Sequence, residues 1–298
     1  MTSALRPPSP SDHGDRGGLA VVLAANLLPL AGVVLLGWRA AEILVVYWIE
    51  LVVTVAAYSV VALFAERPID LEDREFYIVG FSENSEIDSD RWSGDPEPIG
   101  VVGRVLPSAV ADRVPPIYRR NVPVVARSLG IVGFLAFGAI VLADTVVTDP
   151  VAAASSPAVI GAALAVCVSQ AAEIRREFFV TPRYEEWSPY MVLEAAQRVV
   201  TYYLCIGMVA VPVSFLGLVL VAGAVDALAV DPAALGPLAP ADVDPFALAY
   251  VIPFALAKAA ADRSRRVAFD EVDPGGLAGW FAPEDPRPAW LREQEREW

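Results

Sequence analysis

The chain has 298 residues, of which 56% are apolar and only 19% are charged, with 22 Lys+Arg against 36 Asp+Glu and a net charge of −14. This balance excludes an ordinary soluble globule and indicates an integral membrane protein. The acidic excess also argues against a nucleic-acid-binding surface, which needs clustered positive charge. Only Lys258 is lysine. An acid-rich, lysine-poor composition is typical of the acidic proteome of an extreme halophile, with a GC-rich genome as the alternative reading.

The N-terminal part predicts a disordered tail followed by a transmembrane hairpin. Residues 1–18 are rich in Pro, Ser, Gly and Asp and form the predicted cytoplasmic tail. Residues 19–36 carry no charge, and residues 43–65 carry only Glu50. About 20 apolar residues span the hydrocarbon core, so the hairpin occupies 19–65. The first run is too long for the apolar region of a signal peptide, which favours an uncleaved helix.

A polar segment and two more helices follow the hairpin. Residues 66–121 contain 12 acidic residues and predict a cytoplasmic loop. The only strand-like run in this loop is 76–81, which leaves open a small β-rich subdomain or a long ordered loop. Transmembrane helices three and four are predicted within residues 122–172, from uncharged runs at 128–143 and 150–172.

The C-terminal part adds two spans and an acidic tail. The remaining segments are a cytoplasmic loop at 173–198, helices five and six within 199–266 with an external loop at 226–244, and a cytoplasmic tail at 267–298. Helix six, at 245–257, is short for a span. The tail aromatics predict docking on the membrane or on the first loop, and a disordered tail is the alternative.

The distribution of basic residues favours six spans over five. With six spans and a cytoplasmic N-terminus, the external segments are 37–42, 144–149 and 226–244, and they contain one basic residue, Arg39. The other 21 of the 22 basic residues then face the cytoplasm, as the positive-inside rule requires. The expected fold is therefore an all-α polytopic membrane protein of about six transmembrane helices, located in the cell membrane with both termini cytoplasmic.

Several enzyme classes lack the residues that they need. His13 is the only histidine, so a Ser–His protease or a His-ligated metal site has no base or ligand. The sequence has no G-x-G-x-x-G, Walker loop or C-x-x-C motif. Cys167 and Cys205 lie in apolar runs and are predicted to be small core residues. No catalytic residue, metal site or cofactor is predicted.

Polar groups at membrane depth are the candidate functional residues. Glu50 is the only charge deep in the second span and shares a helix face with Tyr47. The first span carries Asn26 and Pro29, and proline exposes a backbone carbonyl one turn earlier. Because the two spans are antiparallel neighbours, an Asn26–Glu50 hydrogen bond is expected. Such a pair is more often interhelical glue than a transport site.

Lys258 and Asp262 are four residues apart on the last helix, which predicts an ion pair at the membrane interface. The alternative has Lys258 turned inward as a counter-ion for Glu50.

The loop between spans four and five offers a second kind of site. Arg175, Arg176 and Arg183 lie there beside aromatic residues. Such a pattern is the ordinary belt of a membrane interface. The same residues are also candidate contacts for an anionic lipid headgroup.

The first hairpin resembles a family of prokaryotic multi-pass membrane proteins that is common in haloarchaea and known only as a domain of unknown function. The matching positions are Asn26, Pro29, Gly32, Val33, Gly37, Trp38, Tyr47, Trp48 and Glu50. The last helix, with Lys258 and Asp262, is similar to that family's closing segment but lacks the histidine that follows the aspartate there. The resemblance implies a helical membrane protein and implies no reaction, substrate or cofactor.

These observations favour a non-enzymatic membrane protein with a scaffold or partner-interaction role. Its expected partners are the lipid bilayer and a membrane protein or a second copy of the chain, without nucleic acid. One alternative is a small transporter or channel component that uses Glu50 as an intramembrane proton or cation site. Another is a membrane enzyme that handles lipid headgroups.

Overall fold

The computed structural model describes part of the chain, in two units. The described residues are 32–33, 37–38, 40–71, 74–82, 97–99, 115–146, 150–227, 245–271 and 274–285. Unit 1 comprises Met1–Ala40 and Tyr203–Ala278, and unit 2 comprises Ala41–Tyr202 and Gly279–Trp298. The predicted tail at 1–18 and most of the first predicted span lie outside the described residues.

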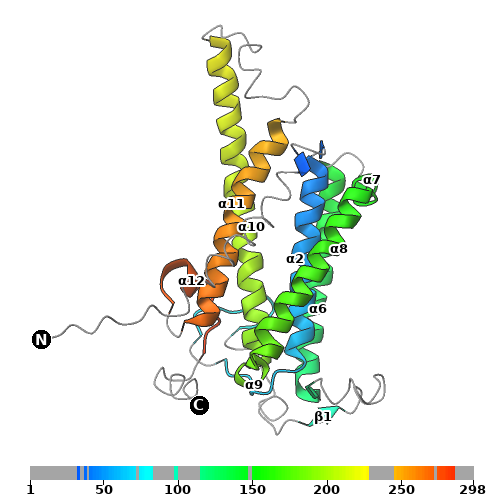
Figure 1. The fold of residues 1–298 in the computed structure, drawn as a ribbon, viewed down its shortest axis with the longest axis vertical. Helices are drawn as coiled ribbons and strands as arrows, with labels where there is room; N and C mark the ends of the chain where they lie inside the picture. Colours follow the sequence, from blue (N-terminus) through cyan, green and yellow to red (C-terminus); the bar gives the residue numbers. More distant parts are fainter. Residues whose placement is uncertain are drawn as a thin grey trace, which may run out of the picture. The chain divides into compact units, whose positions relative to one another are not determined.

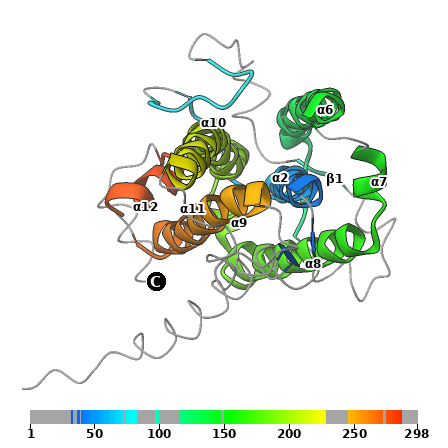
Figure 2. The ribbon, with the colours of Figure 1, turned by 90° about the horizontal axis from the view of Figure 1, so that it is seen from above.

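Unit 2 is built from helices that coincide with predicted spans. They are α2 (Ala40–Ala62), α6 (Val122–Val146), α7 (Pro150–Ala154) and α8 (Pro157–Ile174). Seen from above, α2 lies between α6 and α8 (Figure 2). The predicted span at 150–172 is broken into α7 and α8, because Ser156 caps α8. Its side chain accepts a hydrogen bond from the Val159 N–H at 3.2 Å, and Pro157 occupies the first turn.

Side chains of α2 hold the centre of unit 2 together. The Tyr58 ring packs edge-on against Phe178, with ring centroids 5.4 Å apart. The hydroxyl oxygens of Ser59 and Ser128 lie 3.5 Å apart, which connects α2 to α6. Val55 packs with Val200, in the first part of α10 (Pro189–Ala227). The core therefore lies along α2, where it contacts each of its neighbours.

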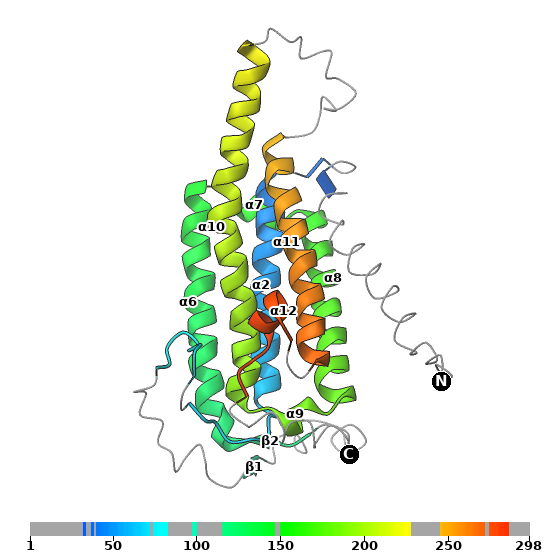
Figure 3. The same cartoon turned by 90° about the vertical axis from the view of Figure 1, so that its left-hand side faces the viewer.

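One end of unit 2 is polar and irregular. It contains η1 (Arg119–Asn121), the π-helical segment η2 (Arg175–Val180) and α9 (Arg183–Glu186). Two short strands, β1 (Pro98–Ile99) and β2 (Ile117–Tyr118), pair antiparallel beside them (Figure 3).

Asn121 closes the end of α2 at this polar end. The amide nitrogen Nδ2 of Asn121 donates to the carbonyl oxygens of Ala62, Leu63 and Ala65 at 3.0, 3.2 and 2.7 Å. Ala62 is the last residue of α2, and Leu63 and Ala65 follow it, so the buried amide donates to carbonyl oxygens at the point where the helix ends.

The strand-like run at 76–81 does not form a strand. Val79 and Gly80 form a turn, with φ of +89° at Gly80. Side chains of α10 bind the backbone here instead of a neighbouring strand. The Ile78 N–H donates to the Tyr190 hydroxyl at 2.9 Å, and the Val79 N–H donates to Gln197 Oε1 at 2.8 Å. The apolar run therefore reflects burial of Ile78 and Phe81 rather than sheet pairing.

Unit 1 contains the later part of α10, α11 (Pro245–Asp270) and the start of α12 (Gly276–Phe281), which are coloured yellow-green to red in Figure 1. Both long helices continue through an internal proline, Pro212 in α10 and Pro253 in α11. Where α10 and α11 pack together, a Cβ at Gly207 would lie 3.6 Å from Phe254, an ordinary contact.

Two of the described helical stretches are long and apolar enough to cross a membrane. They are Glu42–Ala62, with 21 residues, and Pro157–Val180, with 24 residues. The other predicted spans with described residues, at 122–143, 199–225 and 245–257, are helical as well. The prediction that Cys167 and Cys205 are core residues is wrong: both are free and exposed. They lie on outward-facing surfaces of apolar helices.

Candidate functional site

The most buried acidic side chain among the described residues is that of Glu194, whose side chain is 0% exposed. It lies near the start of α10, which begins well before the predicted span. Ser188 and Pro189 determine where this helix starts. The Ser188 hydroxyl accepts a hydrogen bond from the Met191 N–H at 3.2 Å, and Pro189 is compatible with the first helical position.

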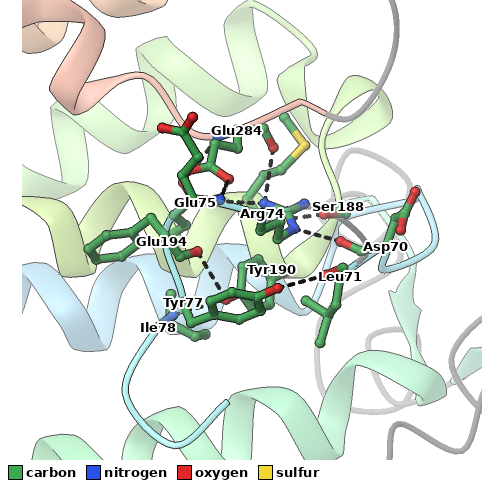
Figure 4. Close-up of polar contacts among 12 residues, drawn as sticks. Asp70, Leu71, Arg74, Glu75, Tyr77, Ile78, Ser188, Tyr190, Glu194 and Glu284 are labelled. Carbon is green, nitrogen blue, oxygen red and sulfur yellow. Dashed lines mark hydrogen bonds and ion pairs between the residues drawn. The ribbon is translucent and has the colours of Figure 1, made fainter. Parts of the chain in front are cut away.

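Two buried arginines neutralise Glu194. Arg74 Nη1 donates to Glu194 Oε2 at 2.8 Å; both residues are labelled in Figure 4. Arg198 Nε donates to Glu194 Oε1 at 2.8 Å. The arginine side chains are only 2% and 6% exposed. Each carboxylate oxygen therefore receives a charge-assisted hydrogen bond, the strong kind in a dry environment.

The C-terminal segment completes this cluster. The Glu284 N–H donates to Glu194 Oε1 at 3.0 Å, and Arg198 Nη2 donates to Glu284 Oε1 at 2.7 Å. Arg74 Nη1 also donates to the Glu284 carbonyl oxygen at 3.1 Å. We call Arg74, Glu194, Arg198 and Glu284 the clamp. With all four groups ionised, the clamp carries two positive and two negative charges, and its net charge is zero.

Aromatic rings enclose the two guanidinium groups of the clamp. Arg74 lies over the Tyr190 ring, 4.5 Å from its centroid, and Arg198 lies over Phe76 at 4.6 Å. Trp280 packs edge-on against Phe76 with centroids 5.8 Å apart. This contact places Trp280 against the 74–82 segment. Cation–π contacts of this kind strengthen when they are desolvated.

Burial dominates the acid–base behaviour of the site. It raises the pKa of Glu194 from 4.5 to about 7, although Arg198, the Glu284 N–H and Arg74 act in the opposite direction. Burial also raises the pKa of Tyr190 to about 12, so this phenol stays protonated at physiological pH. Its hydroxyl accepts from the Ile78 N–H.

The geometry of the clamp suits a structural role. Arg198 Nη1 donates to the Trp280 carbonyl oxygen at 2.7 Å, and Arg74 Nε donates to the Asp70 carbonyl oxygen at 2.6 Å. Among the described residues, Arg74 Nη2 is a buried donor without a hydrogen-bond partner. Glu194 thus holds three segments of the chain together, and both of its oxygens are occupied.

The predicted intramembrane cluster is only partly described. Tyr47 and Glu50 lie on α2, and both are half-buried. Asn26 and Pro29 lie outside the described residues. The Asn26–Glu50 hydrogen bond therefore stays a prediction.

On α11, Lys258 Nζ lies 3.1 Å from Asp262 Oδ2, and their side chains are 15% and 20% exposed. The two residues are brought together as their spacing predicts. Glu50 belongs to unit 2 and Lys258 to unit 1, so the counter-ion alternative also stays a prediction.

The predicted headgroup arginines lie around η2. Arg175 and Arg176 are exposed, and Arg183 is half-buried. Arg176 Nη2 contacts the buried carboxylate of Glu177 at 3.4 Å. Arg183 Nη1 donates to the Glu177 carbonyl oxygen at 3.2 Å. Single π-helical turns occur frequently at functional sites.

Sequence reasoning missed the clamp. One local signal was available: Glu194 and Arg198 are four residues apart, a spacing that places both on one helix face. The sequence carries no local signal for Arg74 or Glu284, because these residues are 120 and 90 residues from Glu194. Among the described residues, no three His, Cys, Asp or Glu side chains gather in a way that could hold a metal ion.

Comparison with known proteins places the chain in a family. The model of a family of unknown function, DUF6498, matches residues 9–230, and the chain belongs to this family. The match covers the predicted first hairpin, the clamp residues Arg74, Glu194 and Arg198, and all of α10, but not Lys258, Asp262 or Glu284. No curated protein and no solved structure matches the chain.

Proposed function

We propose that this member of DUF6498 is a six-span membrane protein that acts as a non-enzymatic scaffold, with the clamp ordering its cytoplasmic face. The observation that carries the membrane assignment is the outward surface of α8. Ile160, Leu164 and Val168 form a row along this helix and are 50%, 63% and 70% exposed. Residues 157–172 contain no charge. A helix with such a surface is stable in lipid and unfavourable in water.

Other helices support the same proposal. Large apolar side chains are also exposed on α6, α10 and α11: Leu129, Phe134, Phe137, Val209, Val213, Leu216, Val219, Leu220, Ile252 and Leu256. These helices coincide with predicted spans three, five and six. Lipid contact accounts for their surfaces without a protein partner on each one.

The polarity of unit 2 supports the proposed orientation. Its described arginines lie where α2 and α8 end and where α6 and α10 begin: Arg67, Arg74, Arg119, Arg120, Arg127, Arg175, Arg176, Arg183 and Arg198. The described residues at the opposite ends of α2 and α6 include the acidic Glu42 and Asp144. By the positive-inside rule, the arginine-rich end faces the cytoplasm.

The scaffold role is supported by the way the clamp uses its charges. A general acid or base needs access to a substrate, whereas both oxygens of Glu194 bind other parts of the chain. The result is a rigid cytoplasmic surface assembled from α10, the 74–82 segment and the C-terminal segment. Such a surface suits binding of a partner protein.

Cysteine labelling tests membrane insertion and orientation. In a background carrying Cys167→Ala and Cys205→Ala, Ser155→Cys and Glu185→Cys place one thiol at either end of unit 2. Both positions are exposed. A membrane-impermeant maleimide is expected to label Ser155→Cys in intact cells, and Glu185→Cys only after permeabilisation. Equal labelling of both in intact cells, or recovery of the protein in the soluble fraction, would refute the topology.

The transport alternative has one supporting observation. Glu50 lies in the middle of α2, one of the two described helical stretches that are long and apolar enough to cross a membrane, and is half-buried there. In proteoliposomes, this alternative requires a pH-dependent flux that Glu50→Gln abolishes. Glu42→Gln removes the same charge in the first turn of α2 and is the matched control. A flux that survives Glu50→Gln excludes a transport role for this residue.

The lipid-enzyme alternative is favoured by the exposed arginines beside the π-helical turn. It predicts turnover of lipids by the purified protein, with loss of activity in Arg175→Gln and Arg176→Gln. Absence of turnover across zwitterionic and anionic lipids would exclude it.

A further inference from the structure

The segment Trp280–Glu284, which we call the strap, lies in unit 2 as a peptide lies in a binding site. The remaining clamp residues and Phe76 come from α10 and the 74–82 segment and form the site. Polar contacts to the strap are made at both of its ends. At one end, Arg198 Nη1 binds the Trp280 carbonyl oxygen at 2.7 Å. At the other, Arg74 Nη1 binds the Glu284 carbonyl oxygen at 3.1 Å.

The Glu284 carboxylate is recognised in a specific way. Its Oε1 accepts a hydrogen bond from Arg198 Nη2 at 2.7 Å, and its Oε2 accepts one from the Glu75 N–H at 2.9 Å. A guanidinium and a backbone N–H, one on each oxygen, are donors suited to a carboxylate ligand. Glu194 Oε1 accepts a hydrogen bond from the Glu284 N–H at 3.0 Å, so the site also binds the backbone of the residue that carries this carboxylate.

Two aromatic side chains anchor the strap beside these polar contacts. Phe281 is 1% exposed, and its ring lies 5.3 Å from that of Tyr202. Trp280 packs on Phe76 and is 38% exposed. The features recognised are therefore a pair of adjacent aromatics, two backbone carbonyls and a carboxylate three residues after the second aromatic.

The site and the strap differ in burial. The side chains of Arg74 and Glu194 are 2% and 0% exposed, whereas that of Glu284 is 27% exposed. Solvent, and hence a competing carboxylate, reaches the outer edge of the strap without disturbing the centre of the clamp. Displacement of the strap would leave Glu194 and both arginines in place, with a net positive charge that attracts an acidic segment.

We propose that this site binds an aromatic–acidic peptide segment of a partner protein, and that the chain's own strap occupies it in cis until such a segment displaces it. The strap is thus a built-in competitor that limits partner binding. This inference rests on the proposed scaffold function and names the chemistry of its partner.

Peptide binding to the full-length protein in detergent tests the inference. The probe is a fluorescein-labelled peptide with the sequence of residues 279–285, and the readout is fluorescence anisotropy. Glu284→Gln weakens the strap in cis but leaves the site intact, so the labelled peptide is expected to bind this variant about tenfold more tightly than wild type. Glu75→Gln is the matched control, because its side chain is exposed and its N–H is retained. A peptide carrying Gln in place of Glu is expected to bind weakly to all three proteins.

A second strap variant shows whether a change in peptide binding comes from the strap or from a general loss of folding. Phe281→Ala removes the buried anchor of the strap without changing any polar group of the site, and it is also expected to strengthen peptide binding. Melting curves identify the variants that remain folded. Binding as weak in both folded strap variants as in wild type would overturn the inference. A wild-type protein that is dimeric in light scattering, and monomeric in both variants, would assign the strap to a second copy and overturn occupancy in cis.

The labelling experiment on Ser155→Cys and Glu185→Cys does not depend on the strap. Failure of peptide binding with the expected labelling pattern would therefore refute this inference alone. An unexpected labelling pattern would refute the membrane topology.

Discussion

Arg198 Nη2 lies 2.7 Å from Glu194 Oε1, one helical turn earlier on α10, and at the same distance from Glu284 Oε1. One guanidinium thus joins two carboxylates that are 90 residues apart in the sequence. Because the Glu194 side chain is fully buried, its charge depends on Arg74 and Arg198 rather than on water. A buried ion pair contributes little net stability over an apolar pair of equal volume, but removal of one partner is expensive.

Arg74→Ala is therefore expected to destabilise unit 2 by about 3–5 kcal/mol, because it leaves Glu194 with a single guanidinium. Thermal unfolding in detergent measures the loss. Arg119→Ala, at an exposed arginine, is the control and is expected to change stability by less than about 0.5 kcal/mol. In a double-mutant cycle with Glu194→Gln, the combined loss is expected to be smaller than the sum. Strict additivity would show that the two residues do not interact.

The pH dependence of stability follows from the raised pKa of Glu194. Its folded-state pKa of about 7 exceeds the ordinary value of 4.5, so the folded protein binds this proton more tightly than the unfolded chain. The stabilisation is fully present below about pH 4.5 and is lost as the pH rises through about 7. The groups facing Glu194 in this window are Arg74, Arg198, Glu284 and Tyr190.

Glu194→Gln tests this pH dependence. The variant carries no titrating group at the site, so its melting temperature is expected to change less than that of wild type between about pH 5 and 8. Glu185→Gln, with the same charge change at an exposed position, is expected to retain the wild-type slope. A wild-type melting temperature that rises across this range would contradict the sign of the prediction.

The sequence predicted the helices of the described residues better than it predicted their contacts. Uncharged runs of suitable length identify a helix in lipid, since every backbone group must be bonded within it. That argument located the helices at 43–65 and 199–225 but not the early start of α10. The polar turn before residue 199 becomes helical because Ser188 caps it and because two groups distant in sequence satisfy Glu194: the Arg74 guanidinium pairs with its charge, and the Glu284 N–H donates to it.

The strand-like run at 76–81 illustrates the same limit. Its residues favour a strand, yet strands need a partner that offers a ladder of backbone groups. The Tyr190 hydroxyl and the Gln197 side-chain oxygen instead accept the hydrogen bonds of the backbone N–H groups of Ile78 and Val79. No local sequence pattern predicts these contacts. Residue spacing predicts a contact only where both partners lie on one helix, as Lys258 and Asp262 do.

Asn121 is expected to be essential for the end of α2. Its buried amide donates to the carbonyl oxygens of Ala62, Leu63 and Ala65, so Asn121→Ala should lower the free energy of unfolding by about 1–3 kcal/mol. Asn121→Asp keeps the volume but replaces the donors with an acceptor, and it is expected to be at least as harmful. Two variants that melt like wild type would show that α2 does not need this cap.

The final prediction concerns the tight contact between Gly32 and Trp38 in unit 1. A Cβ added at Gly32 would lie 2.5 Å from Trp38 Cδ2, closer than real atoms approach. The Trp38 N–H donates to the Gly32 carbonyl oxygen at 3.1 Å, and Gly37 between them has φ of +64°, so the backbone turns the indole onto Gly32. These are three of the positions that carried the family resemblance in the first hairpin, and the contact gives each a physical reason.

Gly32→Ala is therefore expected to lower the melting temperature of the wild-type protein. In a Trp38→Ala background the clash is absent, and the same substitution should be neutral or stabilising, because alanine is favoured over glycine in a helix by about 1 kcal/mol. This change of sign between the two backgrounds distinguishes a steric contact from a general sensitivity of the hairpin. A Gly32→Ala effect of the same size in both backgrounds would show that the indole does not determine the need for glycine.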